Sequence, residues 1–457
     1  MNNVRRTRPA GAADGHRPRE HRSAHHRATR AVPQDRWRIL PLLVVCYLFA
    51  YIDRVNIGFA KLQMAQDVGI SEAVYGLAAG IFFVGYVIFE VPSNLLLRRI
   101  GTRKTVFRIM LLWGITSAAM LFVHDATSFY VLRFLLGVFE AGFAPGIIFY
   151  LTLWYPRARM GAAMAVLMIP GPLGSMIGGP VSALLMTGMD GSAGLAGWQW
   201  MFLLEGLPCV LLAFVVLRFL PNGPGDARWL TAHERVLVEG ALGTGQENGE
   251  HRFRKVLTDP RVYGLAVGYF CLISGLYGVG FWLPTILSEN GIESVVAIGL
   301  WSAVPYAVAL VLMRVLARHS DATGERRLHI VVPTFVGAAG MAVAAFTGST
   351  FVLSMAALIV STACMWGAYT VFWSVPSAFL TGDAAAGGIA FINSIGLLGG
   401  FFSPTLIGYV KETTGSTEIG LLTLVGLLVV GGISLTVTRV RTDVAPAPLA
   451  AGAEGTR

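Results

Sequence analysis

Long apolar runs separated by short polar stretches make up most of this chain. A helix rises about 1.5 Å per residue, so about 20 apolar residues cross the roughly 30 Å hydrocarbon core of a bilayer. Twelve runs reach about that length and predict an all-α membrane protein with twelve transmembrane helices. The predicted spans are residues 38–61, 73–97, 105–123, 127–154, 160–187, 198–220, 260–287, 294–317, 328–349, 352–380, 386–410 and 417–439.

One long polar interruption divides the twelve spans six and six. It covers residues 221–259, where prolines, glycines and charges of both signs replace the apolar pattern. Lys and Arg otherwise concentrate in the tails and in alternate loops, which predicts that those loops and both termini are cytoplasmic. The expected organisation is a disordered basic cytoplasmic tail (1–37), an N-terminal six-helix bundle (38–220), a cytoplasmic central loop (221–259), a C-terminal six-helix bundle (260–440) and a cytoplasmic C-terminal tail (441–457).

The two sets of six spans repeat each other weakly. Residues 98–104 follow span two and residues 321–327 follow span eight, with a glycine and two basic residues matching at an offset of 223. The same offset lays Tyr150 over Trp373. Two pseudo-symmetric bundles that rock about a site near the membrane midplane are typical of secondary transporters.

Composition agrees with a membrane protein. The 457 residues are 54% hydrophobic and 13% charged, with a mean hydropathy of +0.63. The charged fraction is about half that of soluble domains. The net charge of +9 does not indicate nucleic-acid binding, because the basic residues sit between apolar runs. We expect a multi-pass protein of the plasma (inner) membrane, surrounded by lipid and functional as a monomer.

Two pairs of charged residues lie inside apolar spans. Asp53 and Arg54 adjoin in span one, and Arg133 and Glu140 lie in span four. A charge at mid-membrane depth costs about 2.5–3.5 kcal/mol on insertion scales, so these residues need partners. Arg133 and Glu140 are seven residues apart and are expected to face one cavity at depths roughly 10.5 Å apart. Asp53 is turned by about 100° from Arg54 and is expected to face a neighbouring helix.

The residue types in these pairs suit anion binding and proton binding. A guanidinium stays protonated and offers a planar fork of donors to a carboxylate. A buried carboxyl tends to hold a proton, whereas a nearby arginine opposes protonation. If a proton neutralises Asp53 or Glu140, an arginine loses its internal partner and becomes available to an anion. The alternative is a static ion-pair network that holds spans one and four together.

Several motifs in order resemble the anion:cation symporter family of the major facilitator superfamily. The resemblance covers roughly residues 35–440 and is to permeases of the galactonate, tartrate and phthalate type. It implies that this chain has twelve spans and transports an organic anion. The motifs that carry it are 51–60 (YIDRVNIGFA), 89–94 (FEVPSN), 133–142 (RFLLGVFEAG), 198–206 (WQWMFLLEG) and 389–396 (IAFINSIG).

The resemblance assigns roles to individual residues. It implies proton coupling by Asp53 and Glu140. It also implies substrate binding by Arg54 and Arg133, with further contacts from Tyr51, Tyr86 and Asn393. Trp373, from its position in span ten, is a separate candidate for closing one side of the cavity. Gating is assigned to Glu90 and to the loops that hold Arg98, Gly101, Arg103, Asp321, Gly324 and Arg326. The uncharged candidates also have purely structural alternatives. These are aromatic packing for Tyr51 and Tyr86, interhelical hydrogen bonding for Asn393, and anchoring at the membrane interface for Trp373.

The chain departs from the family pattern at two positions. An acidic residue usually lies three before the glycine of the loop after span two, where this chain has Arg98; Asp321 keeps the pattern in the second half. The basic residues of the first loop are therefore expected to pair with Glu90 or another carboxylate. In span eleven, relatives often carry Asn directly after the glycine that corresponds to Gly396, where this chain has Leu397.

Other chemistries lack their motifs. No phosphate-cradling glycine loop indicates ATP use, no cysteine or histidine spacing indicates a metal, and no nucleophile motif indicates an enzyme. The prediction is a proton-coupled symporter that imports a small organic anion by alternating access, with the proton gradient in place of a cofactor. The alternatives are an anion exchanger or efflux carrier, and a carboxylate sensor without turnover.

Overall fold

The computed structural model describes residues 18–155, 157–236, 258–348, 350–380 and 383–438. Every regular element within these ranges is a helix. In the N-terminal part these are α1 (Pro18–Val68), α2 (Glu72–Ile100), α3 (Thr102–Ala119), η1 (Met120–Phe122), α4 (Ala126–Glu140), α5 (Phe143–Thr152), α6 (Arg157–Met168), α7 (Pro170–Met189), η2 (Ser192–Gly194), α8 (Gly197–Phe219) and η3 (Pro224–Asp226). In the C-terminal part they are α11 (Pro260–Glu289), α12 (Val295–Thr323), α13 (Leu328–Phe346), α14 (Phe351–Phe372), α15 (Ser374–Phe379), α16 (Asp383–Thr414) and α17 (Thr417–Val437).

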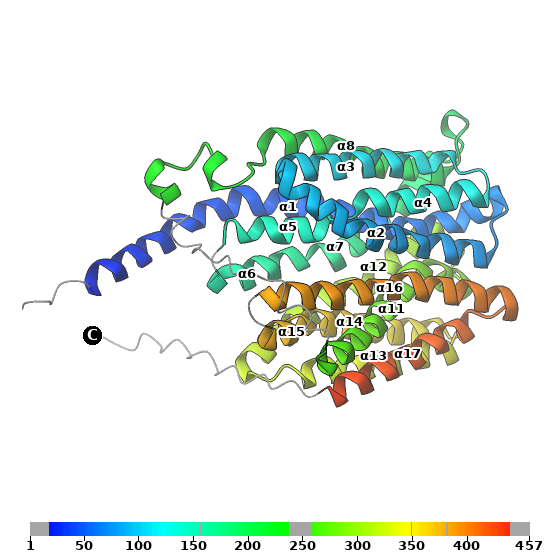
Figure 1. Cartoon of the computed structure of the whole chain (residues 1–457). Coiled ribbons are helices and arrows are strands. Elements are labelled where there is room, and N and C mark those ends of the chain that lie inside the picture. The colour runs from blue at the N-terminus through cyan, green and yellow to red at the C-terminus, as the bar shows by residue number, and fades with distance from the viewer. Residues whose placement is uncertain (1–17, 156, 237–257, 349, 381–382, 439–457) are drawn as a thin grey trace, which may run out of the picture.

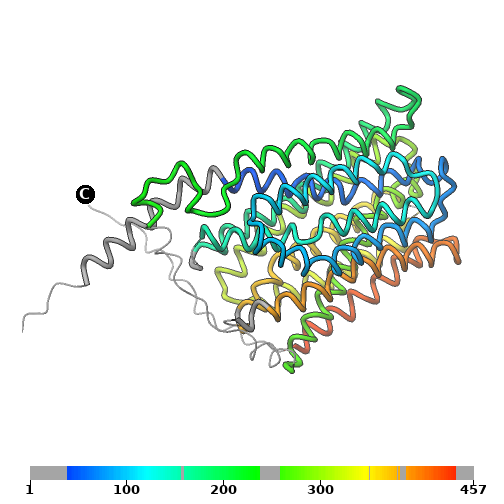
Figure 2. Tube along the Cα trace, turned by 45° about the horizontal axis from the view of Figure 1, so that its top comes forward, coloured from blue at the N-terminus to red at the C-terminus, as the bar shows by residue number. Residues whose placement is uncertain are grey.

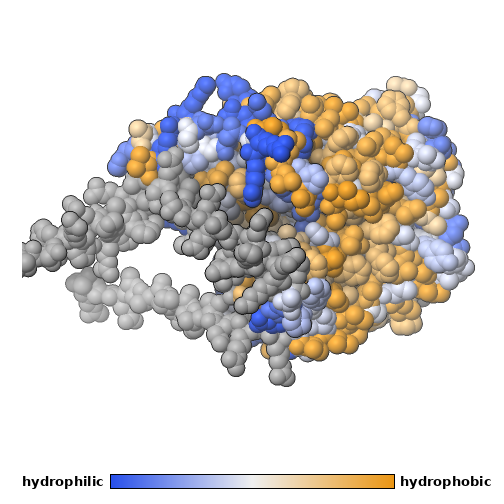
Figure 3. All heavy atoms as spheres, viewed as in Figure 1, coloured by the Kyte–Doolittle hydropathy of each residue, from blue (hydrophilic) through white to orange (hydrophobic). Residues whose placement is uncertain are grey.

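Twelve segments of the described chain are long and apolar enough to cross a membrane, from Ile39–Val68 to Thr417–Val437. The prediction of an all-α protein with twelve membrane-crossing helices is confirmed. Figure 3 shows the same property on one face of the molecule, where apolar residues form a broad belt and polar residues gather toward the ends of the helices.

Helix α1 begins at Pro18, so the structure differs from the expected disordered tail over residues 18–37. This stretch is rich in Arg, Ala and other good helix formers, and it runs directly into the first span. Residues 1–17 of the predicted N-terminal tail and the whole predicted C-terminal tail (441–457) lie outside the described residues.

Three spans, the fourth, fifth and tenth, contain a break between two α-helices, and in the tenth α14 ends at Phe372 and α15 begins at Ser374. The fourth, Ala126–Thr152, consists of α4 and α5, which are separated by Ala141 and Gly142. Gly142 has a φ of +85°, a left-handed conformation that favours glycine. The break directly follows Glu140, so this carboxylate belongs to the last residue of α4. In the fifth span, α7 begins at Pro170, shortly after α6 ends.

The helices form two layers that lie against each other (Figure 1). Helices α1 to α8 form one layer, and α11 to α17 form the other. The layers meet where α2 packs against α16, α7 packs against α12, and α1 packs against α11. These three contacts bring spans from opposite halves of the chain to one central interface.

The internal repeat has a direct spatial consequence at this interface. Arg54 and Tyr277 are related by the offset of 223, and the Arg54 Nη1 donates a hydrogen bond to the Tyr277 hydroxyl at 3.0 Å. Gly58 and Phe281 share the same offset, and a Cβ added to Gly58 would lie 2.8 Å from the Phe281 carbonyl oxygen. Residues at matching positions of the two halves therefore meet where α1 crosses α11.

A cluster of charges joins the two halves at the end away from the tails. The Nζ atoms of Lys61 and Lys411 contact the Glu72 carboxylate at 2.5 and 3.0 Å, and Lys411 Nζ also lies 2.6 Å from Glu289. The Lys61 Nζ lies 4.0 Å from the centre of the Trp282 ring. Since Lys61 and Glu72 come from one half and the other three from the second, this cluster closes that end of the interface.

The first part of the predicted central loop is ordered against the N-terminal layer. Trp229 stacks on Trp154 with the ring centroids 6.0 Å apart and the planes at 16°. Pro224 and Ala227 are buried. Figure 2 places this segment at the end of the N-terminal layer where the first span, Ile39–Val68, begins. Residues 237–257 of the loop lie outside the described residues.

The close approach of α2 and α4 generates a stability prediction. A Cβ added to Gly137 of α4 would lie 1.9 Å from the Phe82 carbonyl oxygen of α2. The backbone cannot yield without separating the helices, and overpacking of this kind costs about 1–3 kcal/mol. We expect Gly137→Ala to lower the thermal unfolding temperature of the purified protein by several degrees in a fluorescence melt.

Gly426→Ala in α17 is the matched control, because a Cβ there would meet nothing within 4 Å. Its unfolding temperature should equal or slightly exceed that of the wild type. Equal melting of Gly137→Ala and the wild type would contradict the tight α2–α4 contact.

Candidate functional site

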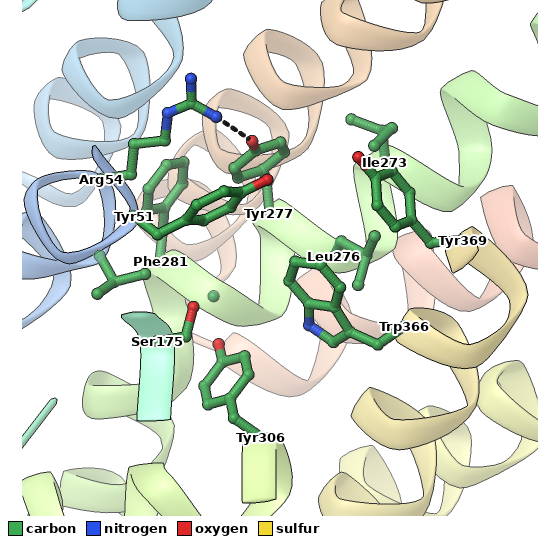
Figure 4. A pocket seen from close by; sticks show the side chains of 12 residues that line it. Tyr51, Arg54, Ser175, Ile273, Leu276, Tyr277, Phe281, Tyr306, Trp366 and Tyr369 are labelled. Carbon is green, nitrogen blue, oxygen red and sulfur yellow. Dashed lines mark hydrogen bonds between the residues drawn. The ribbon is translucent and has the colours of Figure 1, made fainter. Parts of the chain in front are cut away.

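The guanidinium of Arg54 lies at the centre of the interface between the two halves. Its Nε donates to Glu140 Oε1 at 2.9 Å, and its Nη2 donates to the same oxygen. Its Nη1 donates to the Tyr277 hydroxyl at 3.0 Å, the contact drawn in Figure 4. One side chain thus connects α1 to α4 within its own half and to α11 in the other half.

The carboxylate of Glu140 is fully buried, with 0% of the residue exposed. Its Oε1 receives both bonds from Arg54, while its Oε2 has no hydrogen-bond partner among the described residues. A buried ion pair is held together by the low polarity around it, and losing one charge leaves the other uncompensated. Protonation of Glu140 would therefore release the charge of Arg54 to another anion.

Two small cavities share Arg54 as a wall residue. They have volumes of about 30 and 60 Å³, and both are also lined by Tyr51, Ile273, Tyr277 and Tyr369. The first cavity extends toward Ser175, Tyr306 and Trp366, which Figure 4 shows around one space. The second extends toward Tyr47, Tyr86 and Asn393. The two cavities together place one cation among hydroxyl groups, an amide and aromatic rings from both halves.

Aromatic rings surround the Arg54 guanidinium. Its Cζ lies 5.3 Å from the ring centre of Tyr51 and 5.6 Å from those of Phe82 and Tyr86. Ring faces attract cations more strongly where water is excluded. The predicted site residues Tyr51 and Tyr86 are thus brought next to Arg54, and both line a cavity with it.

Arg133 is buried but does not line either cavity at Arg54. Its Nε and Nη2 donate to the backbone carbonyls of Ala78 and Ala79 in α2, at 3.3 and 3.4 Å. Its Cζ lies 5.2 Å from the centre of the Phe82 ring, which Arg54 also contacts. The structure therefore differs from the expectation that Arg133 and Glu140 face one cavity: the carbonyls of α2 hold Arg133, and Arg54 holds Glu140.

Asp53 faces a neighbouring helix, as its position on α1 predicts, and the structure identifies that helix as α3. Its Oδ2 accepts from the indole Nε1 of Trp113 at 2.6 Å, and its Oδ1 accepts from the Ser117 hydroxyl and from Asn56 Nδ2. No ion pair of the described residues includes Asp53. Asn56 also donates to the buried Glu205 at 3.0 Å. The two predicted proton-coupling carboxyls thus lie in different settings, one held by neutral donors and the other by an arginine.

Asn393 in α16 lines the second cavity together with Leu397. Its Nδ2 donates to Glu90 Oε1 of α2 at 3.4 Å, a contact between the two halves. Leu397 contributes an apolar side chain to the wall of the same cavity. Glu90 thus pairs with span eleven and not with the loop that follows its own span.

Trp373 lies one layer behind the cavity, at the junction of α14 and α15. Its ring centre is 4.9 Å from that of Tyr269, and the rings are close to perpendicular. Tyr269 itself lines the second cavity. Trp373 therefore supports a wall residue in this structure and does not line either of the two cavities.

The loop after α2 binds to the segment that follows α8. The Nε of Arg103 donates to the Leu220 carbonyl at 2.5 Å, and its backbone N–H donates to Asn222 Oδ1 at 3.1 Å. Gly101 has a φ of +82°, and a Cβ there would lie 2.7 Å from Asn222 Oδ1. Arg98 is exposed. The structure thus gives Arg103 a carbonyl and an amide as partners, where the sequence predicts Glu90 or another carboxylate.

The corresponding loop of the second half keeps its acidic residue paired. Arg326 Nη1 lies 2.5 Å from Asp321 Oδ1, and Gly324 ends α12 with a φ of +71°. Glu325 accepts from the backbone N–H of Leu328 at 2.8 Å and contacts His329. Burial opposes ionisation of Glu325, but these bonds outweigh it and hold the pKa of its carboxyl below the usual value.

Sequence reasoning missed the wall residues of the C-terminal half. Tyr277, Tyr306, Trp366 and Tyr369 all line the first cavity. They stand in apolar spans where an aromatic residue is ordinary and no charge draws attention. The offset of 223 contained a signal for one of them, because it maps Arg54 onto Tyr277.

Comparisons with known proteins agree with this architecture. Residues 43–404 match the family model described as Major Facilitator Superfamily. The chain is 48% identical over 407 residues to a putative tartrate transporter of Agrobacterium vitis, covering 88% of this chain and 90% of the relative. It is 42% identical over 404 residues to a quinolone resistance transporter of Acinetobacter baumannii, covering 88% and 92%.

A solved structure shows the same fold. It is the inward-facing, unoccupied structure of a bacterial homolog of the human lysosomal transporter Spinster, with a TM-score of 0.73, 16% identity and coverage of 88% of this chain and 96% of that one. The similar sequences are those of named transporters and not of enzymes. The family model and these relatives together establish that the chain is a multi-pass membrane protein that belongs to the Major Facilitator Superfamily.

Proposed function

We propose that the protein is a proton-coupled symporter that imports a small organic anion by alternating access. The observation that carries this proposal is the buried Arg54–Glu140 pair beside two cavities on the interface between the halves. A buried arginine is an anion site whenever its own carboxylate is neutralised. The same group therefore responds to both a proton and a carboxylate.

Competition between Glu140 and the substrate gives the coupling. When Glu140 is ionised, it forms an ion pair with Arg54. The pair has no net charge, so it does not attract an anionic substrate. When Glu140 takes a proton, Arg54 becomes the only charge at the cavity walls and attracts one carboxylate. The loaded carrier and the empty carrier each have few unpaired charges, which favours rocking of the halves in those two states.

Hydroxylated carboxylates are the substrates that the cavity walls favour. Arg54 offers a charge-assisted bond, and Tyr51, Tyr86, Tyr277 and Asn393 offer hydroxyl and amide partners around it. Leu397 keeps one wall apolar. The similar protein named a putative tartrate transporter supports a small hydroxy acid as the first substrate to test.

Asp53 and Arg133 have supporting roles in this mechanism. Asp53 accepts from three neutral donors and is proposed as a further proton site that acts within the N-terminal half. Arg133 donates to carbonyls of α2 and shares the Phe82 ring with Arg54. It reaches an anion only if the cavity rearranges, so Arg54 is the primary anion ligand of the proposal.

Outward export of an aromatic acid is the second candidate function. The first cavity has aromatic walls that include Tyr306 and Trp366, and one similar protein is named a quinolone resistance transporter. The two candidates differ in the direction of net flux under a proton gradient. Accumulation of a labelled acid inside right-side-out vesicles favours import, and its depletion favours export.

Replacement of Glu140 tests the proton coupling. Uptake of labelled L-tartrate into proteoliposomes is compared with and without an inward proton gradient. Glu140→Gln should abolish accumulation above equilibrium, because the variant cannot exchange its proton, while exchange of internal for external tartrate continues. Gradient-driven accumulation that survives in Glu140→Gln would contradict the role of Glu140.

Glu293→Gln is the control for this experiment, because it makes the same change in an exposed loop between α11 and α12. It should accumulate tartrate like the wild type. If the wild type moves no tartrate, a panel of hydroxy, sugar and aromatic acids takes its place, and the gradient test is repeated with the acid that moves.

The geometry of Arg54 generates a second prediction. Arg54→Lys keeps the charge but loses the planar fork, and charge-assisted hydrogen bonds contribute about 1.5–3 kcal/mol. We expect the KM for the transported acid to rise at least about tenfold. Tyr277→Phe, which removes one neutral hydroxyl, should raise KM only a few-fold.

Arg318→Lys serves as the matched control at an exposed position of α12. It should leave KM unchanged. An unchanged KM in Arg54→Lys would show that the guanidinium does not bind the substrate and that the Arg54–Glu140 pair is structural.

A further inference from the structure

A basic cavity lies at the tail end of the N-terminal layer, remote from the site at Arg54. It has a volume of about 440 Å³. It forms where the end of α8, the start of α3 and the ordered part of the central loop come together. Its lining residues are Arg103, Leu217, Arg218, Phe219, Pro221, Asp226, Arg228 and Trp229.

The walls of this cavity are held by specific contacts. Arg103 fixes the turn after α8 through the Leu220 carbonyl, and Asn222 receives the backbone N–H of Arg103. Trp229 stacks on the buried Trp154. The cavity is therefore built by the fold of residues 220–229 against α3 and against Trp154, which follows α5, and does not depend on a single exposed side chain.

The charge inside the cavity is positive. Arg218 and Arg228 are exposed, and no ion pair among the described residues includes either of them. The acidic wall residue, Asp226, accepts a bond from Asn222 Nδ2 at 2.9 Å. Two guanidiniums thus remain available to an anion from outside the protein.

An apolar stripe leads along α8 to the cavity. Leu207, Leu211, Phe214 and Leu217 are all exposed, at spacings of three and four residues that place them on one side of the helix. Phe219 at the end of the helix is also exposed and lines the cavity. Since α8 crosses the membrane, this stripe lies against lipid chains, and the cavity lies at headgroup level.

We propose that this cavity binds the headgroup of an anionic phospholipid, with the lipid phosphate on Arg218 and Arg228 and the acyl chains along α8. A guanidinium matches a phosphate oxygen pair in shape and charge. A soluble phosphate compound would use the two arginines but not the apolar stripe. A zwitterionic lipid would use the stripe but bring its own cation to the arginines.

Binding of defined lipids to the full chain tests this assignment. Native mass spectrometry of the detergent-solubilised protein follows titration with phosphatidylglycerol or phosphatidylcholine. We expect the wild type to retain one phosphatidylglycerol molecule in clear preference to phosphatidylcholine. Each arginine near an anionic headgroup contributes about fivefold in affinity, so Arg218→Gln/Arg228→Gln should weaken phosphatidylglycerol binding more than about tenfold.

The control is Arg314→Gln/Arg318→Gln, which removes two exposed charges from α12 in the other half. It should bind phosphatidylglycerol like the wild type, and all three proteins should unfold at similar temperatures without added lipid. The proposal is overturned if both lipids bind equally, or if the Arg218→Gln/Arg228→Gln variant binds phosphatidylglycerol like the control. Binding of inorganic phosphate that is lost in the Arg218→Gln/Arg228→Gln variant, without any preference of the wild type for phosphatidylglycerol over phosphatidylcholine, would overturn it in favour of a soluble anion.

Discussion

The charge of Arg54 is the constraint on which the centre of this protein depends. A guanidinium buried in a membrane-crossing helix must have a partner, and Glu140 on α4 supplies one. The remaining donors reach Tyr277 across the interface, and three aromatic rings surround the group. In the proposed mechanism this arginine is the anion ligand, and Glu140 already holds it in place before an anion binds. If a substrate carboxylate replaces the Glu140 carboxylate as the partner of Arg54, the number of unpaired charges inside the membrane stays the same.

The location of this site follows from the internal repeat. Because α1 and α11 are related halves of a pseudo-symmetric pair, their matching positions approach each other where the helices cross, and Arg54 meets Tyr277 there. The cavity is consequently asymmetric in chemistry although it is symmetric in architecture. The N-terminal half contributes the charged wall residue, Arg54, whereas both halves contribute tyrosines and the C-terminal half adds a tryptophan. Movement of one half relative to the other would change the surroundings of Arg54 directly, which links binding to conformation.

The two ends of the bundle differ in how they are held. At the end away from the tails, Lys61, Glu72, Lys411 and Glu289 join the halves through ion pairs that must separate before that end can open. At the opposite end, the ordered segment after α8 binds to α3 and to Trp154 within one half and creates a basic cavity. The proposed lipid would occupy this cavity without crossing between the halves. It would therefore stabilise the N-terminal layer as a unit and leave the rocking interface free.

The sequence by itself determined the spans, their number and the charged residues inside them, because hydrophobic length and the cost of buried charge are local properties. The rotation of Asp53 away from Arg54 also follows from the helical period, and Asp53 does face α3. The tertiary structure alone decided which partner each charge has. The helical period fixes the angle between two side chains on one helix, but it does not say which helix lies opposite. Glu140 therefore pairs with Arg54, 86 positions away, while Arg133 on the same helix face binds the carbonyls of α2. The tyrosines of the C-terminal half and the arginines at the end of α8 acquire their setting in the same way, through packing between segments that are distant in the chain.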